Sequence, residues 1–220
     1  MKSLIRQLRR IRYFRYQFFL LKDIYKASFA FSYRGIPTVK LPFDVTNYQL
    51  LLHDLKPDLI LEIGTFKGGS SLFFADFLSS MSTDFEIHTI DVADYVEDNL
   101  VRNNSKIKRF HGGWNNYNLG ALEGFSNILV IDDGSHSFSD VVGAFKKFSP
   151  FIRKGGFYVI EDAIVSILGV EQELKLEGGP KSAIEVCLKN SPEFEICRRY
   201  QDFWGPFLTS SPWGYLQKTS

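Results

Sequence analysis

Apolar segments of two kinds alternate along most of the chain. Short runs rich in apolar residues have the length of strands, and the segments between them have helical spacing. Strands that alternate with helices favour a mostly parallel sheet with helices on both faces, which is a doubly wound α/β fold. The predicted strands lie at 59–63, 86–91, 107–111, 127–132, 156–161, 193–201 and 213–218, and the predicted helices lie at 69–80, 95–102, 137–149 and 181–190.

The first part of the chain does not share this alternation. Helical spacing covers residues 4–27, a connection with glycine and proline follows at 28–43, and a further helix is predicted at 43–55. At 220 residues the chain is long enough for one compact domain with its own core. We therefore predict a helical N-terminal segment at 1–35 and a single α/β domain at 36–220.

The N-terminal segment carries most of the basic charge. Residues 1–40 hold ten Lys or Arg and one acid (+9), and the other 180 hold sixteen and twenty-four (−8), which sum to +1. Its longest apolar run, Phe18 to Leu21, is too short for a membrane span or a typical signal peptide. A basic helix rich in aromatic residues is typical of peripheral contact with an anionic membrane, here through residues 1–26. The alternative is a helix that packs on its own domain or on a second subunit of a homo-oligomer.

The overall composition is that of a soluble globular protein, with 45% hydrophobic and 23% charged residues. The two cysteines, Cys187 and Cys197, form neither a metal-binding pair nor a disulfide framework. A reducing, cytoplasmic location is therefore expected, peripheral to a membrane if the basic segment binds one.

A glycine-rich turn links the first predicted strand of the sheet to the following helix. In the pattern Glu62-x-Gly64-x-x-x-Gly68-x-Ser70, Gly64 permits a tight turn, Gly68 lets the chain approach a ligand, and Ser70 can cap the helix. Such a junction presents unpaired N–H groups and the positive end of a helix dipole to a polar cofactor. It lacks the Gly-Lys-Ser/Thr of a phosphate-binding loop, and Phe66 replaces the second glycine of the dinucleotide fingerprint. A purely structural turn is the alternative.

Acidic residues stand where the later strands end, which is the edge at which such sheets bind ligands. Asp91 is in place to hold the hydroxyls of a ribose, and a helix cap is the alternative. Asp133, Glu161 and Asp162 end two strands that we expect to be adjacent, so their carboxylates would converge and repel one another. A hard divalent cation, Mg²⁺ above all, relieves such repulsion. The arrangement of these acids therefore predicts a metal site. The alternative is that these acids cap helices or face water.

His136 follows Asp133 by three residues, near the start of a predicted helix. A neutral imidazole there can accept a proton from a substrate hydroxyl, and the positive end of the helix disfavours the imidazolium. A structural histidine that caps the helix or adjoins the metal is the alternative.

These motifs together resemble the cephalosporin hydroxylase-like branch of class I S-adenosylmethionine-dependent methyltransferases, which includes rhamnosyl and macrolide-sugar O-methyltransferases. The resemblance covers most of residues 33–218. It is carried by Tyr33-Arg-Gly-Ile-Pro-Thr-Val-Lys40, Pro57-Asp-Leu-Ile-Leu-Glu-Ile-Gly64, Asp132-Asp-Gly-Ser-His136, Val159-Ile-Glu-Asp162, Gly178-Gly-Pro180 and Gly214-Tyr-Leu216. It implies a Rossmann-like fold with seven strands, extended at the N-terminus by the helical segment.

The resemblance also implies roles for single residues. The cofactor-binding set that it implies is Glu62, Gly64, Thr65, Gly68 and Ser70 around the methionine part of S-adenosylmethionine, Asp91 at the ribose, and Gly113 and Trp114 near the adenine. The implied metal ligands are Asp133, Glu161 and Asp162, and the implied catalytic residues are Asp133 and the general base His136.

From this resemblance we expect metal-assisted methylation of a hydroxyl on a sugar or glycan-like acceptor, for example a lipopolysaccharide sugar. A hydroxylase or nucleotide-dependent enzyme on the same fold is one alternative, and a non-catalytic cofactor-binding module is another. A hydroxylase would commonly hold redox iron with two histidines and one carboxylate, but only His136 stands near the acids. A nucleic-acid partner is not expected, because only the basic N-terminal segment suggests one.

Overall fold

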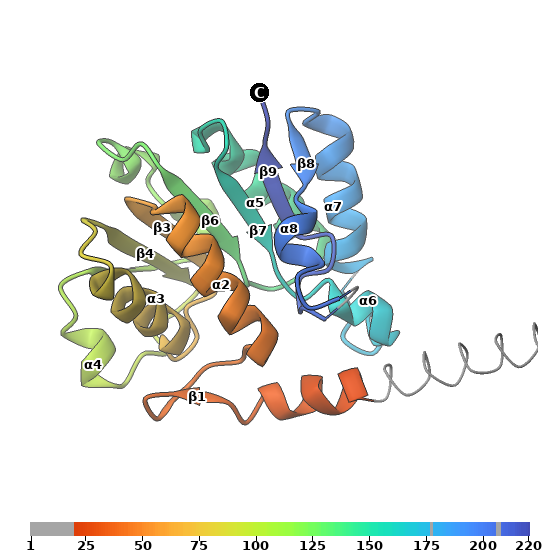
Figure 1. The fold of residues 1–220 in the computed structure, drawn as a ribbon, viewed down its shortest axis with the longest axis horizontal. Helices are drawn as coiled ribbons and strands as arrows, with labels where there is room; N and C mark the ends of the chain where they lie inside the picture. The colour runs from red at the N-terminus through yellow and green to blue at the C-terminus, as the bar shows by residue number, and fades with distance from the viewer. Residues whose placement is uncertain (1–19, 177, 206–207) are drawn as a thin grey trace, which may run out of the picture.

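One seven-stranded sheet forms the centre of the molecule (Figure 1). The computed structural model describes residues 20–220 except residues 177 and 206–207. The strands of the sheet are β3 (Leu59–Ile63), β4 (Glu86–Asp91), β5 (Ile107–His111), β6 (Ile128–Asp132), β7 (Phe157–Ile160), β8 (Phe194–Ile196) and β9 (Tyr215–Lys218). Their spatial order is β5-β4-β3-β6-β7-β9-β8. The doubly wound fold predicted from the sequence is confirmed.

The strand order reverses between β3 and β6, which are parallel neighbours. The first five strands in this order pair in parallel, and β9 pairs antiparallel to both β7 and β8. In the register of β3 and β6, Ile63 lies opposite Asp132, so the two strands end at the same level. Loops that leave the sheet at this reversal diverge to opposite faces and leave room for a ligand between them.

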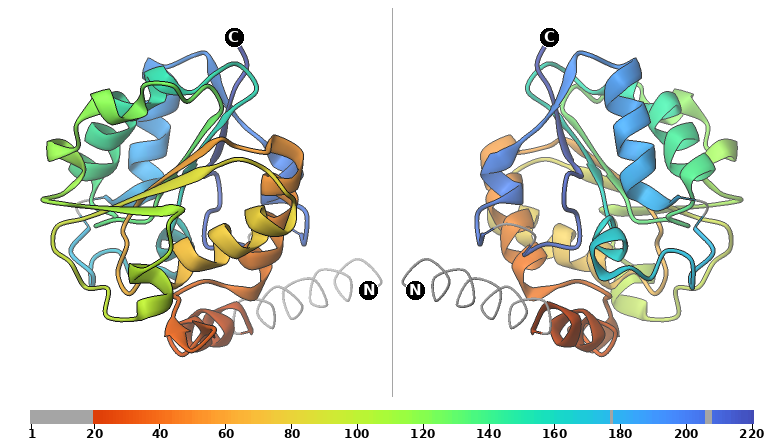
Figure 2. Two further views of the ribbon diagram at one scale, coloured as in Figure 1. Left: turned by 90° about the vertical axis from the view of Figure 1, so that its left-hand side faces the viewer. Right: turned by 90° about the vertical axis from the view of Figure 1, so that its right-hand side faces the viewer.

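Helices cover both faces of the sheet (Figure 2). One face carries α2 (Pro42–Leu55), α3 (Gly69–Ser80) and α8 (Arg198–Gln201), and the other carries α5 (Phe138–Phe148) and α7 (Gly179–Asn190). Along β3, Ile60 belongs to the first apolar cluster, whereas Leu59 and Leu61 belong to the second. Side chains of a strand alternate between faces, so this strand is apolar throughout because both of its faces are buried.

Short elements make the connections. They are β1 (Ser32–Tyr33), β2 (Ile36–Pro37), α4 (Asn99–Arg102), α6 (Ile164–Leu168), and the 3-10 helices η1 (Trp114–Asn116), η2 (Leu119–Leu122) and η3 (Ser149–Phe151). The hairpin of β1 and β2 lies inside the predicted connection at 28–43, and α6 lies where no element was predicted. The predicted strand at 193–201 is instead the short strand β8 followed by α8.

The N-terminal helix is described from residue 20 and ends at residue 28, so most of the helix predicted at 4–27 lies outside the described residues. In the described part, Leu21 is buried against Leu41, Ile164 and Leu168. Residues 20–28 therefore pack on their own domain. No helix in the described part of the chain has the length and apolar character that crossing a membrane requires. Membrane contact through residues 1–26 stays a prediction, as does the domain boundary after residue 35.

The turn after β3 touches the loop after β6. Gly64 has a φ of +98°, and a methyl group at its Cα would lie 2.0 Å from the carbonyl oxygen of Asp133. The N–H of Asp133 donates to the carbonyl oxygen of Ile63 at 2.8 Å, and the N–H of Gly64 donates to that of Ile90 at 2.8 Å. Only glycine fits here, because the turn needs a positive φ and no side chain.

We expect the substitution Gly64→Ala to lower the free energy of unfolding by about 3 kcal/mol or more, since the strain of a positive φ adds to a backbone collision. Gly124 is a matched control, because its φ is +92° and a methyl group there meets nothing within 4 Å. Gly124→Ala should cost only about 1–2 kcal/mol, the strain of the left-handed conformation. Urea denaturation of the two variants measures both values, and equal losses would mean that the approach to Asp133 adds nothing.

Candidate active site

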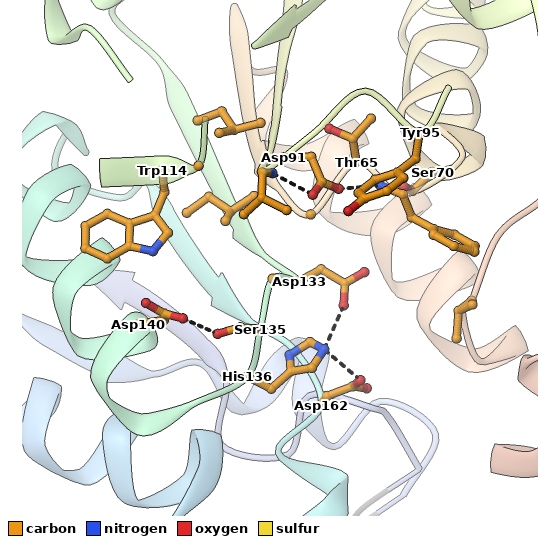
Figure 3. A pocket seen from close by; sticks show the side chains of 18 of the residues that line it. Thr65, Ser70, Asp91, Tyr95, Trp114, Asp133, Ser135, His136, Asp140 and Asp162 are labelled. Carbon is orange, nitrogen blue, oxygen red and sulfur yellow. Dashed lines mark hydrogen bonds and ion pairs between the residues drawn. The ribbon is translucent and has the colours of Figure 1, made fainter. Parts of the chain in front are cut away.

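A cavity of about 930 Å³ opens at the carboxyl ends of the parallel strands (Figure 3). Its walls come from the turn after β3, the ends of β4 and β5, the loops after β6 and β7, and the N-terminal helix. The predicted site residues that line it are Gly64, Thr65, Ser70, Asp91, Gly113, Trp114, Asp133, His136 and Asp162. Glu62, Gly68 and Glu161 are not among the lining residues.

Glu62 lies behind the wall of the cavity. Its buried carboxylate accepts hydrogen bonds from Ser70 at 2.5 Å, from Thr89 at 2.7 Å, and from Ser71. Burial raises the pKa of Glu62, and these three hydroxyl groups oppose that rise. Glu62 thus fixes the first turn of α3, while Ser70 is the residue at the cavity.

Gly68 is the residue before α3 and has a φ of +82°. The sequence predicted that it lets the chain approach a ligand. A methyl group there would instead lie 2.8 Å from the side chain of Val101, which follows β4 in the chain. Gly68 is therefore required by its backbone conformation and by packing against Val101, and the approach of the chain to a ligand at this residue stays a prediction. Its role in cofactor binding stays a prediction.

Asp91 ends β4 and faces the cavity from the turn side (Figure 3). One carboxylate oxygen accepts the N–H of Phe66 at 2.9 Å, and the other accepts the N–H of Val92 at 2.7 Å. The cap of the following helix α4 is Asp98, whose side chain accepts the N–H of Leu100. Asp91 is therefore oriented by backbone groups, and each of its oxygens keeps capacity for another donor.

The loop that carries Gly113 and Trp114 is anchored on α5. The ammonium group of Lys147 donates to the carbonyl oxygens of Trp114 at 3.0 Å, Asn115 at 2.8 Å and Tyr117 at 2.8 Å. The indole of Trp114 also packs where α5 has a glycine, Gly143, at which a methyl group would lie 2.5 Å from a ring carbon. No local pattern pointed to Lys147, because its partners precede it by about thirty residues.

Asp133, His136 and Asp162 converge on one wall (Figure 3). One ligand atom of each lies within 4.8 Å of the others, an arrangement suited to a metal ion. The Nε2 atom of His136 is 3.2 Å from a carboxylate oxygen of Asp162 and 3.9 Å from one of Asp133. His136 and Asp162 have φ angles of +58° and +56°. Such strained backbone is found mainly at functional sites, where the surrounding structure enforces it.

The charges of this cluster act on one another. Burial is the main cause that raises the pKa of both Asp133 and Asp162. Burial also lowers the pKa of His136, but the nearby carboxylates, Asp162 first, outweigh it and raise the pKa. The sequence predicted the opposite direction from the helix dipole alone. That prediction was wrong because it left out the negative charges of Asp162 and Asp133, which raise the pKa of His136.

Glu161 is buried behind the wall of the cavity and does not line it. Its carboxylate accepts hydrogen bonds from the ammonium group of Lys40 and the hydroxyl of Tyr48, each at 2.6 Å. The same ammonium group lies 2.6 Å from the second carboxylate oxygen of Asp133. Sequence reasoning missed Lys40 and Tyr48, since no local pattern joins them to acids more than ninety residues away. Direct ligation of a metal by Glu161 stays a prediction.

The N-terminal helix supplies Tyr25 to the cavity, and Phe29 follows directly after that helix; sequence reasoning foresaw neither. Their rings pack edge to face with centroids 5.3 Å apart. Burial raises the pKa of Tyr25 to about 12, and the negative charges of Asp162 and Asp133 add to the rise. The negative charges of Asp162 and Asp133 therefore act on the hydroxyl of Tyr25 as well as on the ring of His136.

Known proteins match this chain in sequence and in structure. The model of the Rhamnosyl O-methyltransferase/CmcI family matches residues 25–219. A Rhamnosyl O-methyltransferase of Mycobacterium tuberculosis is 27% identical over 194 residues, which are 84% of this chain and 77% of the relative. A solved structure of CmcI with SAH has a TM-score of 0.66 at 19% identity and covers 86% of this chain and 83% of the other. A form of CmcI with Mg and SAM has a TM-score of 0.64 at 20% identity, with coverage of 86% and 77%.

We expect Lys147→Gln to lower the free energy of unfolding by about 1–3 kcal/mol, because carbonyl groups that lose a charged donor are left without an equal partner. The loop at 114–117 should also become more accessible. Urea denaturation gives the first value, and hydrogen exchange of the loop amides gives the second. An unchanged exchange rate would show that Lys147 does not anchor the loop.

Proposed function

The chain belongs to the Rhamnosyl O-methyltransferase/CmcI family, and we propose that it transfers a methyl group from S-adenosylmethionine to a hydroxyl group of a sugar with the help of a divalent cation. The observation that carries this proposal is the single cavity that joins the glycine turn, Asp91 and the cluster of Asp133, His136 and Asp162. A methyl donor and an ion-assisted acceptor need such a shared space.

The residues on one side of the cavity suit S-adenosylmethionine. Gly64, Thr65 and Ser70 line the cavity at the turn before α3, and the positive end of that helix favours a carboxylate. Asp91 offers two oriented oxygens to the hydroxyls of a ribose. Trp114 supplies an aromatic surface on a loop that α5 holds in place. Together these groups offer contacts to the amino-acid part, the ribose and the adenine of the donor.

The residues on the other side suit a hard divalent cation. Asp133 and Asp162 offer carboxylate oxygens with a raised pKa, which means that they lack full compensation for their burial. The imidazole of His136 lies beside Asp162, and Glu161 directly precedes Asp162 in the sequence. Oxygen-rich sites of this kind favour Mg²⁺ or a similar ion. When bound, a divalent cation lowers the pKa of a hydroxyl group that it contacts.

His136 accepts the proton of the acceptor hydroxyl at Nε2, the ring nitrogen that faces Asp133 and Asp162. A positioned base of this kind contributes about 10²–10⁴-fold to a rate. His136 lines the cavity, and its contact with Asp162 orients the imidazole there. The walls align the acceptor oxygen with the methyl group, and such alignment is worth about 7–11 kcal/mol of the barrier.

The acceptor occupies the side of the cavity that the N-terminal helix and the segment after α6 enclose. The lining residues from these parts of the chain are Tyr25 and Phe29 near the N-terminal helix, Val165 in α6, and Leu174 and Leu176 after it. The names of the mycobacterial relatives support a sugar as acceptor. A hydroxyl such as that of Tyr25 can orient a sugar, while the apolar side chains exclude water from the reacting oxygen.

We expect Asp91→Asn to weaken the binding of S-adenosylhomocysteine by about tenfold, because a charge-assisted hydrogen bond to the ribose is replaced by a neutral one. Isothermal titration calorimetry measures the change, with Asp140→Asn as the control because Asp140 lines the cavity but is bonded to Ser135. NAD and ATP should give no heat of binding. Tighter binding of either nucleotide than of S-adenosylhomocysteine would contradict the proposed donor.

Asp133→Asn should lower the rate of methyl transfer by about 10²-fold or more, since the ion and the base both depend on this carboxylate. Its affinity for S-adenosylhomocysteine should stay close to that of the wild type. Transfer is followed by mass spectrometry with 4-nitrophenyl α-L-rhamnoside and a panel of other glycosides. Wild-type activity of this variant in the presence of a chelator would rule out the metal-assisted reaction.

A further inference from the structure

We propose that Lys40 is a positioning residue that holds the carboxylates of the ion site in place, and that its charge limits the affinity of the site for a divalent cation. This inference rests on the proposed function, because it takes a divalent cation to bind beside Asp133 and Asp162. It concerns a residue that belongs to neither the glycine turn nor the strand ends. Lys40 lies between β2 and α2.

The side chain of Lys40 is almost fully buried, with 4% of it exposed. Its ammonium nitrogen lies 2.6 Å from one oxygen of Asp133 and 2.6 Å from one oxygen of Glu161. The hydroxyl of Tyr48 donates to the same oxygen of Glu161 at 2.6 Å. A buried ammonium group that bridges two carboxylates fixes both of them, and the cost of its desolvation is met only while both contacts persist.

The two oxygens of Asp133 are divided between two tasks. Oδ2 receives the ammonium group of Lys40, whereas Oδ1 lies 3.9 Å from Nε2 of His136. Lys40 therefore sets the rotation of the Asp133 carboxylate and leaves one oxygen toward the cluster with Asp162. An ion pair that served stability alone would not need to leave this oxygen directed into the cavity.

Charge gives Lys40 its second effect. Among the described residues that line the cavity, Lys40 is the only lysine or arginine, whereas Asp133 and Asp162 are both lining acids. Its charge compensates the carboxylates before a cation arrives. The same charge repels a cation that binds Asp133, and in a partly buried site this repulsion is only weakly screened. Lys40 therefore holds the carboxylates in place before a cation binds, but it lowers the affinity of the site for that cation.

The test is a titration with Mn²⁺, followed by the electron paramagnetic resonance signal of the free ion. Lys40→Gln keeps a hydrogen-bond donor but removes the charge. We expect its dissociation constant for Mn²⁺ to be lower than that of the wild type by about tenfold or more. In chelator the variant should melt at a lower temperature than the wild type, and Mn²⁺ should raise its melting temperature more, since a ligand of the folded state stabilises it.

Two variants serve as controls. Lys40→Arg keeps the charge but not the shape of the side chain, so its affinity for Mn²⁺ should stay closer to that of the wild type than the affinity of Lys40→Gln does. Lys147→Gln also removes a lysine that anchors a loop, but its partners are carbonyl groups, so it should lose stability without any change in Mn²⁺ affinity. This pair separates the effect of charge at the ion site from a general loss of stability.

Unchanged or weaker Mn²⁺ binding by Lys40→Gln, beside normal binding by the wild type, would overturn this inference and leave the proposed function standing. A Lys40→Gln protein that stays unfolded both in chelator and in Mn²⁺ would also overturn it, because Lys40 would then be structural alone. Absence of Mn²⁺ binding by both proteins would remove the proposed ion together with the inference. Folding of the variant only when Mn²⁺ is present would support it.

Discussion

The contact between the turn at Gly64 and the carbonyl group of Asp133 is the constraint on which the rest of the site depends. It exists because β3 and β6 are parallel neighbours that end at the same level, where the strand order reverses. A side chain at Gly64 would collide with the Asp133 backbone, so the chain can close here only with glycine. The proposed donor site and the proposed ion site therefore share one cavity, as methyl transfer between their ligands requires.

Electrostatic contacts of Asp133 add to this backbone constraint. Asp133 stands between two partners, because Lys40 holds one of its oxygens while the other faces His136 and Asp162. His136 and Asp162 both have positive φ angles, a left-handed conformation that these two residue types tolerate better than most. Burial and mutual repulsion leave these acids with a raised pKa, and that unbalanced charge is the feature a divalent cation would satisfy.

The elements that the sequence predicted well are those with a local signal. The core strands and α3 follow from apolar runs and glycine positions, and the acids at strand ends follow from the order of these elements. The hairpin of β1 and β2 was missed because strands of two residues have no period to detect. Lys40 and Tyr25 were missed because their partners come from distant parts of the chain, so only tertiary packing brings them to Asp133 and Asp162. The direction of the His136 pKa was wrong for another reason, because the helix dipole was weighed without the charges of the acids that were expected nearby.

The measurement that tests the shared cavity most directly is the paramagnetic effect of Mn²⁺ on bound S-adenosylhomocysteine, followed by proton NMR. If the ion binds at Asp133 and Asp162 while the turn at Gly64 holds the amino-acid part of the ligand, Mn²⁺ must broaden the signals beside the sulfur atom strongly. The adenine signals, beside Trp114, must broaden less, and a diamagnetic Mg²⁺ sample supplies the reference. Equal broadening of all signals, or none in a sample where both ligands bind, would contradict a cavity that brings the methyl donor and the cation together.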